Sequence, residues 1–160
     1  MVQIAAARIY AIGGMKLLTA ASALLGATAF GVQLLARRTG WSLALTIASW
    51  YPFLFLLAGR LYVRPEVITL VCLSCFLTIF FHADRQPRLL LALLPLQVLW
   101  VNVQGLFILG LLLAGIYWVD GMWRVVQRQT HPRIWTRTML LAALIVLCLL
   151  NPYGVRGLMF

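Results

Sequence analysis

The chain has 160 residues, of which 64% are hydrophobic and only 10% are charged, and its mean hydropathy is +0.99. A soluble domain of this length could not bury so many apolar side chains, whereas long uncharged runs are typical of integral membrane proteins. The net charge of +10 comes from cations in short clusters between apolar runs, as the positive-inside rule describes, so we expect membrane lipids and not nucleic acid as partners.

Several apolar runs are long enough to enter a bilayer as helices, since about 20 residues cross the hydrocarbon core. In chain order, the shorter runs are residues 17–36, 41–59, 67–81 and 138–150. The last of them extends back to residue 134 if Arg137 snorkels to the membrane interface. Residues 82–88 are hydrophilic, and Pro87 breaks any helix there. Residues 120–137 are also hydrophilic, and we expect them to form a basic cytoplasmic loop.

The longest uncharged run, residues 89–119, has polar residues at its centre, including Asn102 and Gln104. As one helix it would be about 46 Å long, against a hydrocarbon core of about 30 Å. We therefore predict a short hairpin of two membrane segments that turns near Asn102. The fold expected from this count is an all-α polytopic transmembrane bundle of about six membrane segments. It would form a single transmembrane domain over residues 1–160.

The positions of the cations give this bundle an orientation. A hairpin at residues 89–119 places eight arginines on the cytoplasmic face and five Lys and Arg on the external face. Three polar segments from different turns then lie together on the external face. They are residues 60–66, 100–105 and 151–156.

The segment Arg64-Pro65-Glu66 has two interpretations. Proline and glutamate are typical of a helix start, where proline is tolerated and the helix dipole favours an anion. Alternatively, the segment is an anion-binding or acid–base site on the external face. Glu66 is the only acidic residue on that face, so it is the one candidate for a catalytic general base.

Neither the cysteines nor the histidines form a metal-binding pattern. Cys72-Leu-Ser-Cys75 has the spacing of a metal or redox pair, but the sequence holds no second pair to complete a site. His82 and His131 have no partner at ligand spacing. We therefore expect neither a metal nor another cofactor.

Three motifs, taken in order, resemble those of a known group of proteins. They are Val63-Arg-Pro65, the run from Leu93 to Gly105 that ends in Trp100-Val-Asn-Val-Gln-Gly105, and Asn151-Pro-Tyr-Gly-Val-Arg156. The chain is similar to large, mostly uncharacterised bacterial multi-pass membrane proteins related to the GT-C glycosyltransferases, the class that includes protein mannosyltransferases and aminoarabinose transferases. In that group Arg-Pro is followed by Trp-x-Asn-x-His-Gly and then by Asn-Pro-Tyr-Gly.

The resemblance implies a protein of the bacterial cytoplasmic (inner) membrane that transfers a sugar from a polyprenyl-phosphate donor at the external face. Arginines near the motifs would attract the lipid phosphate, and polar side chains would bind sugar hydroxyls. The candidate substrate-binding residues are Arg60, Arg64, Trp100, Asn102, Gln104, Asn151, Tyr153 and Arg156.

The chain departs from the group's pattern in two places. Gln104 stands where the group usually has histidine, and the external loop that carries the catalytic acidic residue has no counterpart. We therefore expect an internal fragment of a longer protein, inactive alone, with a partner chain supplying the missing segments. The alternatives are a small non-enzymatic membrane transporter or assembly subunit, and a split-gene remnant without a function of its own.

Overall fold

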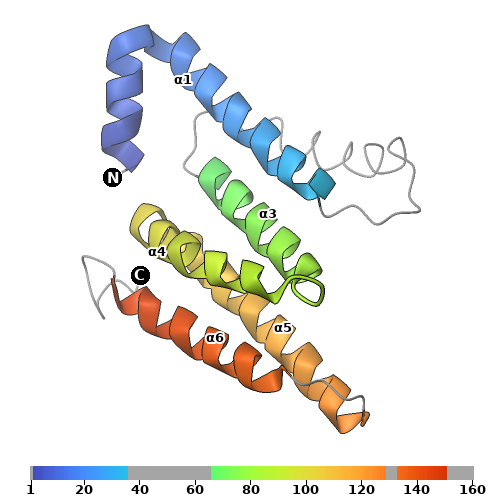
Figure 1. The fold of residues 1–160 in the computed structure, drawn as a ribbon. Coiled ribbons are helices and arrows are strands. Elements are labelled where there is room, and N and C mark those ends of the chain that lie inside the picture. Colours follow the sequence, from blue (N-terminus) through green and yellow to red (C-terminus); the bar gives the residue numbers. More distant parts are fainter. Residues whose placement is uncertain (1, 36–65, 129–132, 151–160) are drawn as a thin grey trace. The chain divides into compact units, whose positions relative to one another are not determined.

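The computed structural model describes residues 2–35, 66–128 and 133–150, and every regular element in them is a helix (Figure 1). The expected all-α class is therefore confirmed for these residues. The α-helices are α1 (Val2–Leu35), α3 (Glu66–His82), α4 (Leu93–Val103), α5 (Ile108–Val126) and α6 (Ile134–Leu147). Three short 3-10 helices join or extend them: η1 (Pro87–Ala92), η2 (Gly105–Phe107) and η3 (Cys148–Leu150).

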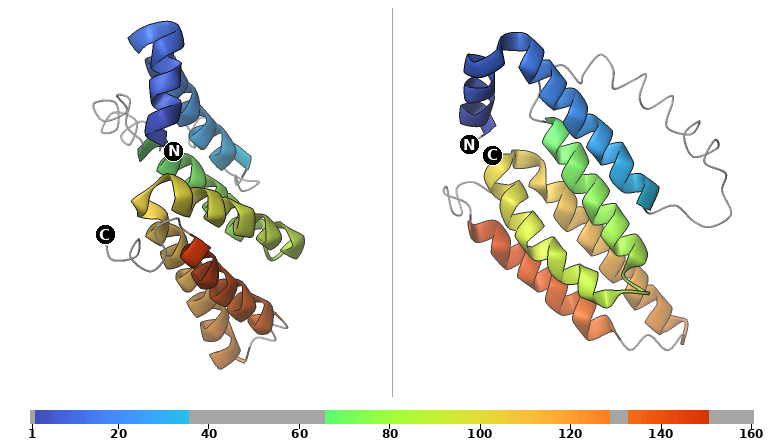
Figure 2. Two further views of the ribbon diagram at one scale, coloured as in Figure 1. Left: turned by 90° about the vertical axis from the view of Figure 1, so that its left-hand side faces the viewer. Right: turned by 45° about the horizontal axis from the view of Figure 1, so that its top comes forward.

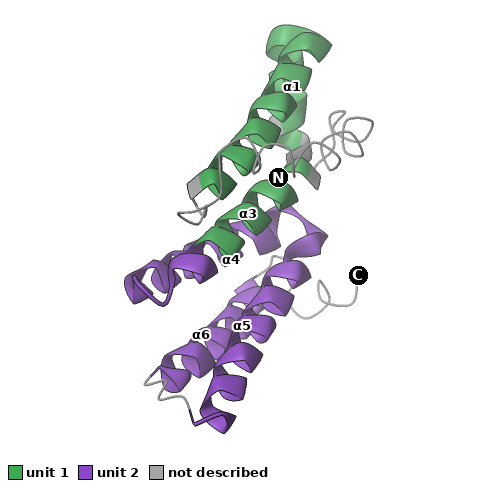
Figure 3. Ribbon diagram, turned by 90° about the vertical axis from the view of Figure 1, so that its right-hand side faces the viewer, with its two compact units in different colours: residues 1–78 green, residues 79–160 purple. Residues whose placement is uncertain are grey.

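The chain divides into two compact units, residues 1–78 (unit 1) and residues 79–160 (unit 2) (Figure 3). The boundary falls inside α3. The expected single transmembrane domain remains a prediction. The expected apolar run at residues 41–59 lies outside the described residues.

Unit 1 contains α1 and most of α3. The end of α1 at Leu35 agrees with the predicted end of the first apolar run, but α1 begins at Val2 and is broken at Gly14. Two hydrogen bonds connect the last turns of α1 to α3. Gln33 Nε2 donates to Ser74 Oγ at 3.1 Å, and Thr78 Oγ1 donates to the carbonyl oxygen of Val32 at 3.2 Å.

The two ends of α3 follow from the sequence around them. The helix begins at Glu66, directly after Pro65, because proline lacks an amide hydrogen and is tolerated only where that donor is not needed. It ends at His82, and η1 then begins at Pro87. The predicted helix break at residues 82–88 is thus confirmed.

In unit 2, α6 contacts both α4 and α5 (Figures 1 and 2). Many of the side chains buried in this unit recur at helical spacing along η1 and α4 and along α6 and η3. They include Leu90, Leu93, Gln97, Trp100, Leu140, Leu144 and Cys148. The buried positions of α5 are small, Gly110, Ala114 and Gly121, and small residues let helix backbones approach closely.

The run of residues 89–119 forms two helices and not one. After α4 ends at Val103, Gln104 is extended, with φ −156° and ψ 147°, and α5 then runs back in the opposite direction (Figures 1 and 2). The predicted hairpin is confirmed as two helices, and its turn lies at Gln104, two residues after the expected position at Asn102. Only its second helix is long enough to cross a membrane.

Two other expectations are corrected by the lengths of the helices. Among the described residues only Ala6–Leu34 and Gly105–Val126 are long and apolar enough to cross a membrane. The other apolar helices have 17 residues or fewer, so about six membrane segments are not supported. The expected loop at residues 120–137 is mostly helical, because α5 continues to Val126 and α6 begins at Ile134.

The burial pattern of α6 gives a test of the packing in unit 2. Leu144→Ala should lower the free energy of unfolding by about 2–5 kcal/mol, because it leaves a cavity where Leu144 is fully buried. Ile145→Ala is the matched control, since Ile145 is 52% exposed on the same helix, and its loss should stay below about 1 kcal/mol. Unfolding of the detergent-solubilised chain by SDS, followed by tryptophan fluorescence, measures both. Equal losses would contradict the burial of this face.

Candidate functional site

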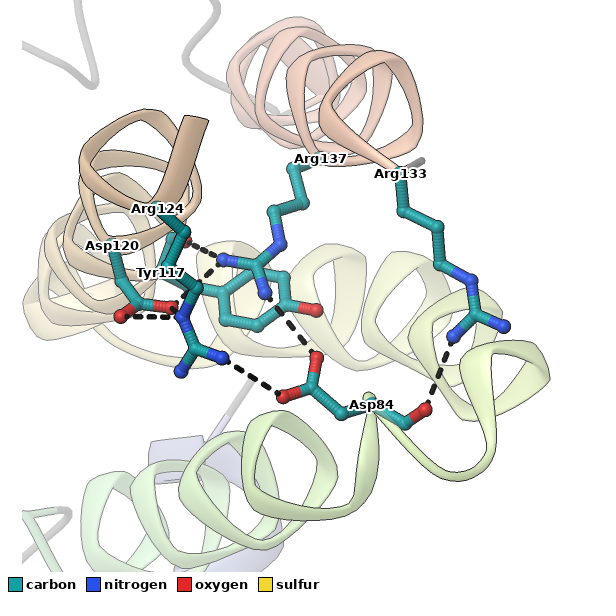
Figure 4. A network of polar contacts seen from close by, with 6 residues as sticks. All are labelled: Asp84, Tyr117, Asp120, Arg124, Arg133 and Arg137. Carbon is teal, nitrogen blue, oxygen red and sulfur yellow. Dashed lines mark hydrogen bonds and ion pairs between the residues drawn. The ribbon is translucent and has the colours of Figure 1, made fainter. Parts of the chain in front are cut away.

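A network of charged side chains lies in unit 2 where α5 ends and α6 begins (Figure 4). We name it the charged cluster: Asp84, Tyr117, Asp120, Arg124, Arg133 and Arg137. Three of these residues recur on one face of α5 because residues three and four apart on a helix are neighbours. The turn after α3 and the start of α6 contribute the others.

Arg137 is the centre of the cluster. Its side chain is only 1% exposed, and its guanidinium pairs with Asp120 Oδ2 at 3.0 Å and with Asp84 Oδ1 at 3.3 Å. One guanidinium nitrogen also donates to the carbonyl oxygen of Tyr117 at 2.7 Å. The guanidinium carbon lies 3.9 Å from the centroid of the Tyr117 ring, which stacks on Phe80 with centroids 4.7 Å apart. A buried guanidinium needs such partners, because an unpaired one would cost several kcal/mol.

Two further arginines complete the cluster. Arg124 Nε donates to Asp120 Oδ1 at 3.1 Å, and another of its nitrogens lies 3.8 Å from Asp84 Oδ2. Arg133 donates to the backbone carbonyl oxygen of Asp84 at 3.1 Å. Both carboxylates are therefore engaged by arginine, which makes the cluster a cross-link between chain segments.

The position of Arg137 corrects the expectation that it snorkels to the membrane interface. The side chain turns into unit 2, where Gly121 leaves room for it. A Cβ atom at residue 121 would lie 2.8 Å from Arg137 Cδ and 2.9 Å from a guanidinium nitrogen. The sequence contained a signal for this network, since only Asp84 and Asp120 follow Glu66 as acidic residues, and Asp120 precedes Arg124 by one helical turn.

The predicted substrate-binding motif Trp100–Gly105 lies at the opposite end of α5. Trp100 is fully buried in unit 2, whereas Asn102 and Gln104 are half-buried. Asn102 Nδ2 donates to the carbonyl oxygen of Val98 at 2.7 Å and to that of Leu150 at 3.4 Å. The end of α4 is thereby joined to the end of η3, directly before the motif that begins at Asn151.

The remaining predicted site residues are not brought together in the described parts of the chain. Arg60, Arg64, Asn151, Tyr153 and Arg156 lie outside the described residues. Glu66 is the first residue of α3 and belongs to unit 1. Its role as a general base remains a prediction.

A buried glutamine that the sequence did not single out lies one turn before Trp100. Gln97 is fully buried, and its Nε2 donates to Cys148 Sγ at 3.2 Å and to the carbonyl oxygen of Phe107 at 3.5 Å. Its Oε1 accepts no hydrogen bond from the described residues. Gln97 thus connects α4 with η2 and η3 inside unit 2.

The space beside Gly121 gives the first test of the charged cluster. Gly121→Ala should lower the stability of unit 2 by about 1–3 kcal/mol, because the added methyl group overlaps the Arg137 side chain. Gly115→Ala is the matched control on α5, since a Cβ there meets nothing within 4 Å. Alanine also favours a helix over glycine by about 1 kcal/mol. Thermal unfolding in detergent compares the two, and equal losses would contradict the packing of Arg137 against Gly121.

The second test removes the charges that neutralise Arg137. Asp84→Asn with Asp120→Asn should cost about 3–5 kcal/mol, because the buried guanidinium loses both counter-charges. Arg137→Met alone should cost less, since the carboxylates are 49% and 43% exposed and keep water and Arg124. Adding Arg137→Met to the double variant should recover much of its loss. Strictly additive losses in this mutant cycle would contradict the coupling.

Comparisons of this chain with protein-family models, with curated proteins and with solved structures found no match. The roles of its residues therefore rest on the sequence and on the geometry of the two ends of unit 2. One end is held together by paired charges. The other presents amides beside the end of the last described helix.

Proposed function

We propose that the chain is a membrane-embedded helical part of a GT-C-like glycosyltransferase that binds a polyprenyl-phosphate-linked sugar beside the turn between α4 and α5. The chain supplies binding residues for this donor, and Glu66 remains its candidate for a catalytic carboxylate. The proposal has two parts, embedding in a bacterial inner membrane and recognition of the lipid-linked sugar.

The exposure of the long apolar helices supports membrane embedding. In Ala6–Leu34 and Gly105–Val126 only 11% and 22% of the most apolar window are buried. Leu112, Ile116 and Val119 on α5 are each more than half exposed. A core helix of a soluble protein would bury most of such residues, whereas a helix in lipid can leave them facing the acyl chains.

The placement of polar groups in unit 2 supports two aqueous faces. The charged cluster and the α4–α5 turn are separated by most of α5, since the helix rises about 22 Å between residues 105 and 120. Three exposed arginines with no ion pair among the described residues lie near members of the cluster in sequence. They are Arg85, Arg88 and Arg128. This distribution fits cations on the cytoplasmic face and an uncharged amide turn on the external face.

The observation that carries the sugar-binding proposal is the hydrogen bond from Asn102 Nδ2 to the carbonyl oxygen of Leu150. It joins the Trp100–Gly105 motif to Leu150, the residue that directly precedes the Asn-Pro-Tyr-Gly motif in the sequence. Asn102 Oδ1 accepts no hydrogen bond from the described residues, which leaves it free to accept one from a sugar hydroxyl.

The donor's phosphate requires cations at this end. Arg64 and Arg156 belong to the motifs that carry the resemblance, and a guanidinium binds phosphate through two parallel hydrogen bonds. We assign them to the phosphate and Asn102, with Gln104, to the sugar. Because the group usually has histidine at the position of Gln104, this chain would bind there through an amide and not through an imidazole.

Binding of undecaprenyl phosphate to the chain in lipid nanodiscs, measured by native mass spectrometry, tests the assignment. Arg64→Gln with Arg156→Gln should weaken binding at least about tenfold, because a hydrogen bond to a charged group contributes about 1.5–3 kcal/mol. Arg85→Gln with Arg128→Gln is the matched control, since it removes the same charge from positions outside the three motifs. It should change binding less than about twofold.

Equal weakening by the two double variants would show that binding follows total charge, and the assigned phosphate site would then be wrong. Absence of binding by the unmodified chain would overturn the proposal for this segment.

A further inference from the structure

We propose that residues 2–13 form an interfacial helix, which lies in the headgroup region of an anionic bilayer, and that residues 15–35 form the membrane span that follows it. This inference rests on the proposed membrane embedding and adds a lipid-binding segment to it. The break at Gly14, the length of the helix after the break and the distribution of charge carry it.

The backbone at Gly14 forces a change of direction within α1. Its φ of 61° and ψ of −158° lie in a region that essentially only glycine adopts. The helical segments before and after it meet at a sharp bend in both views of unit 1 (Figures 1 and 2). The two segments therefore cannot cross a bilayer together as one straight helix.

The length of the second segment matches the membrane. At 1.5 Å per residue, residues 15–35 extend about 31 Å, close to the hydrocarbon thickness of about 30 Å. The whole of α1 has 34 residues and would extend about 51 Å if it were straight. The helix that follows the break at Gly14 is therefore about as long as the hydrocarbon core is thick.

The charges of α1 fit the surface of an anionic membrane. Arg8 and Lys16 are exposed, and α1 contains no acidic residue. Arg8 lies in the middle of residues 2–13, a position where arginine is strongly disfavoured in hydrocarbon. In the headgroup region each cation instead strengthens binding to anionic lipid by roughly fivefold.

The apolar side chains of the same segment account for its depth. Ile4 is 63% exposed, Tyr10 57% and Ile12 82%, so the segment has apolar surface on more than one side. Such a helix is held at the boundary between headgroups and acyl chains, where tyrosine is enriched and apolar side chains reach the acyl region.

Depth-dependent fluorescence quenching tests the placement. The full chain is prepared without its native cysteines, labelled with an environment-sensitive dye at a single cysteine, and reconstituted in phosphatidylcholine vesicles with about 30% phosphatidylglycerol. The labelled variants are Ile4→Cys, Ile12→Cys and Leu24→Cys. Spin-labelled lipids that quench at the headgroup, at mid-chain and at the bilayer centre report the depth of each dye.

The dyes at residues 4 and 12 should both be quenched most strongly by the headgroup label, and the dye at residue 24 by the label at the bilayer centre. A depth that increases steadily from residue 12 to residue 4 would show a second span and overturn the interfacial placement. If no lipid quenches the dyes at residues 4 and 12 while the dye at residue 24 is quenched at the bilayer centre, the first segment packs against protein or is exposed to water. That result would also overturn the interfacial placement. A dye at residue 24 that no lipid quenches would overturn the membrane embedding itself.

Two variants test the causes separately, Arg8→Glu in the protein labelled at residue 12 and Gly14→Ala in the protein labelled at residue 4. Arg8→Glu should reduce headgroup quenching at least twofold in the anionic vesicles and leave it unchanged in phosphatidylcholine alone. Gly14→Ala, which the positive φ disfavours, should straighten α1 and remove residue 4 from the headgroup depth. Gly31→Ala is its control, because a Cβ there meets nothing within 4 Å. If Arg8→Glu has no effect, the proposed role of charge is wrong. If Gly14→Ala has no effect, the proposed role of the bend is wrong.

Discussion

The need to neutralise the buried guanidinium of Arg137 fixes where three segments of unit 2 meet. Arg137 is almost completely enclosed, and a cation in apolar surroundings is tolerated only when carboxylates and backbone carbonyls surround it. Both acidic residues of the unit meet this need. The turn after α3, the end of α5 and the start of α6 are consequently held at one place, and the packing of α6 against α4 and α5 follows from there.

The helices of this chain could be predicted where proline, charge and apolar run length agreed. The start of α3 after Pro65, the break before Pro87 and the two helices within residues 89–119 followed from these signals. The continuation of α5 to Val126 did not. Its last turns carry Asp120 and Arg124. Counted as separate charges, these residues predict a hydrophilic loop, whereas their i, i+4 spacing is typical of an ion pair on a helix.

The candidate site was predictable to a smaller extent than the fold. The hydrogen bond between Asn102 and Leu150 joins the end of α4 to the end of η3, because a hairpin and a returning helix bring those ends together, and the expected convergence of the three motifs remains a prediction. The burial of Arg137 could not be read from a pattern of single residues. It depends on the absence of a side chain at Gly121. From the sequence alone, a glycine in an apolar helix does not indicate which side chain packs against it.

The order of the cluster's members along the chain has a consequence for synthesis. Asp84, Asp120 and Arg124 all precede Arg137, so a ribosome completes both carboxylates before it makes their buried partner. Before α6 is made, Arg124 is the one arginine of the charged cluster on the earlier described segments that pairs with these carboxylates. The contacts of α5 with α6 are also missing at that stage. The synthesis of α6 is therefore the step that completes the packing of unit 2, and a nascent chain stalled before it would present an unfinished, acid-bearing surface to the cell's quality control.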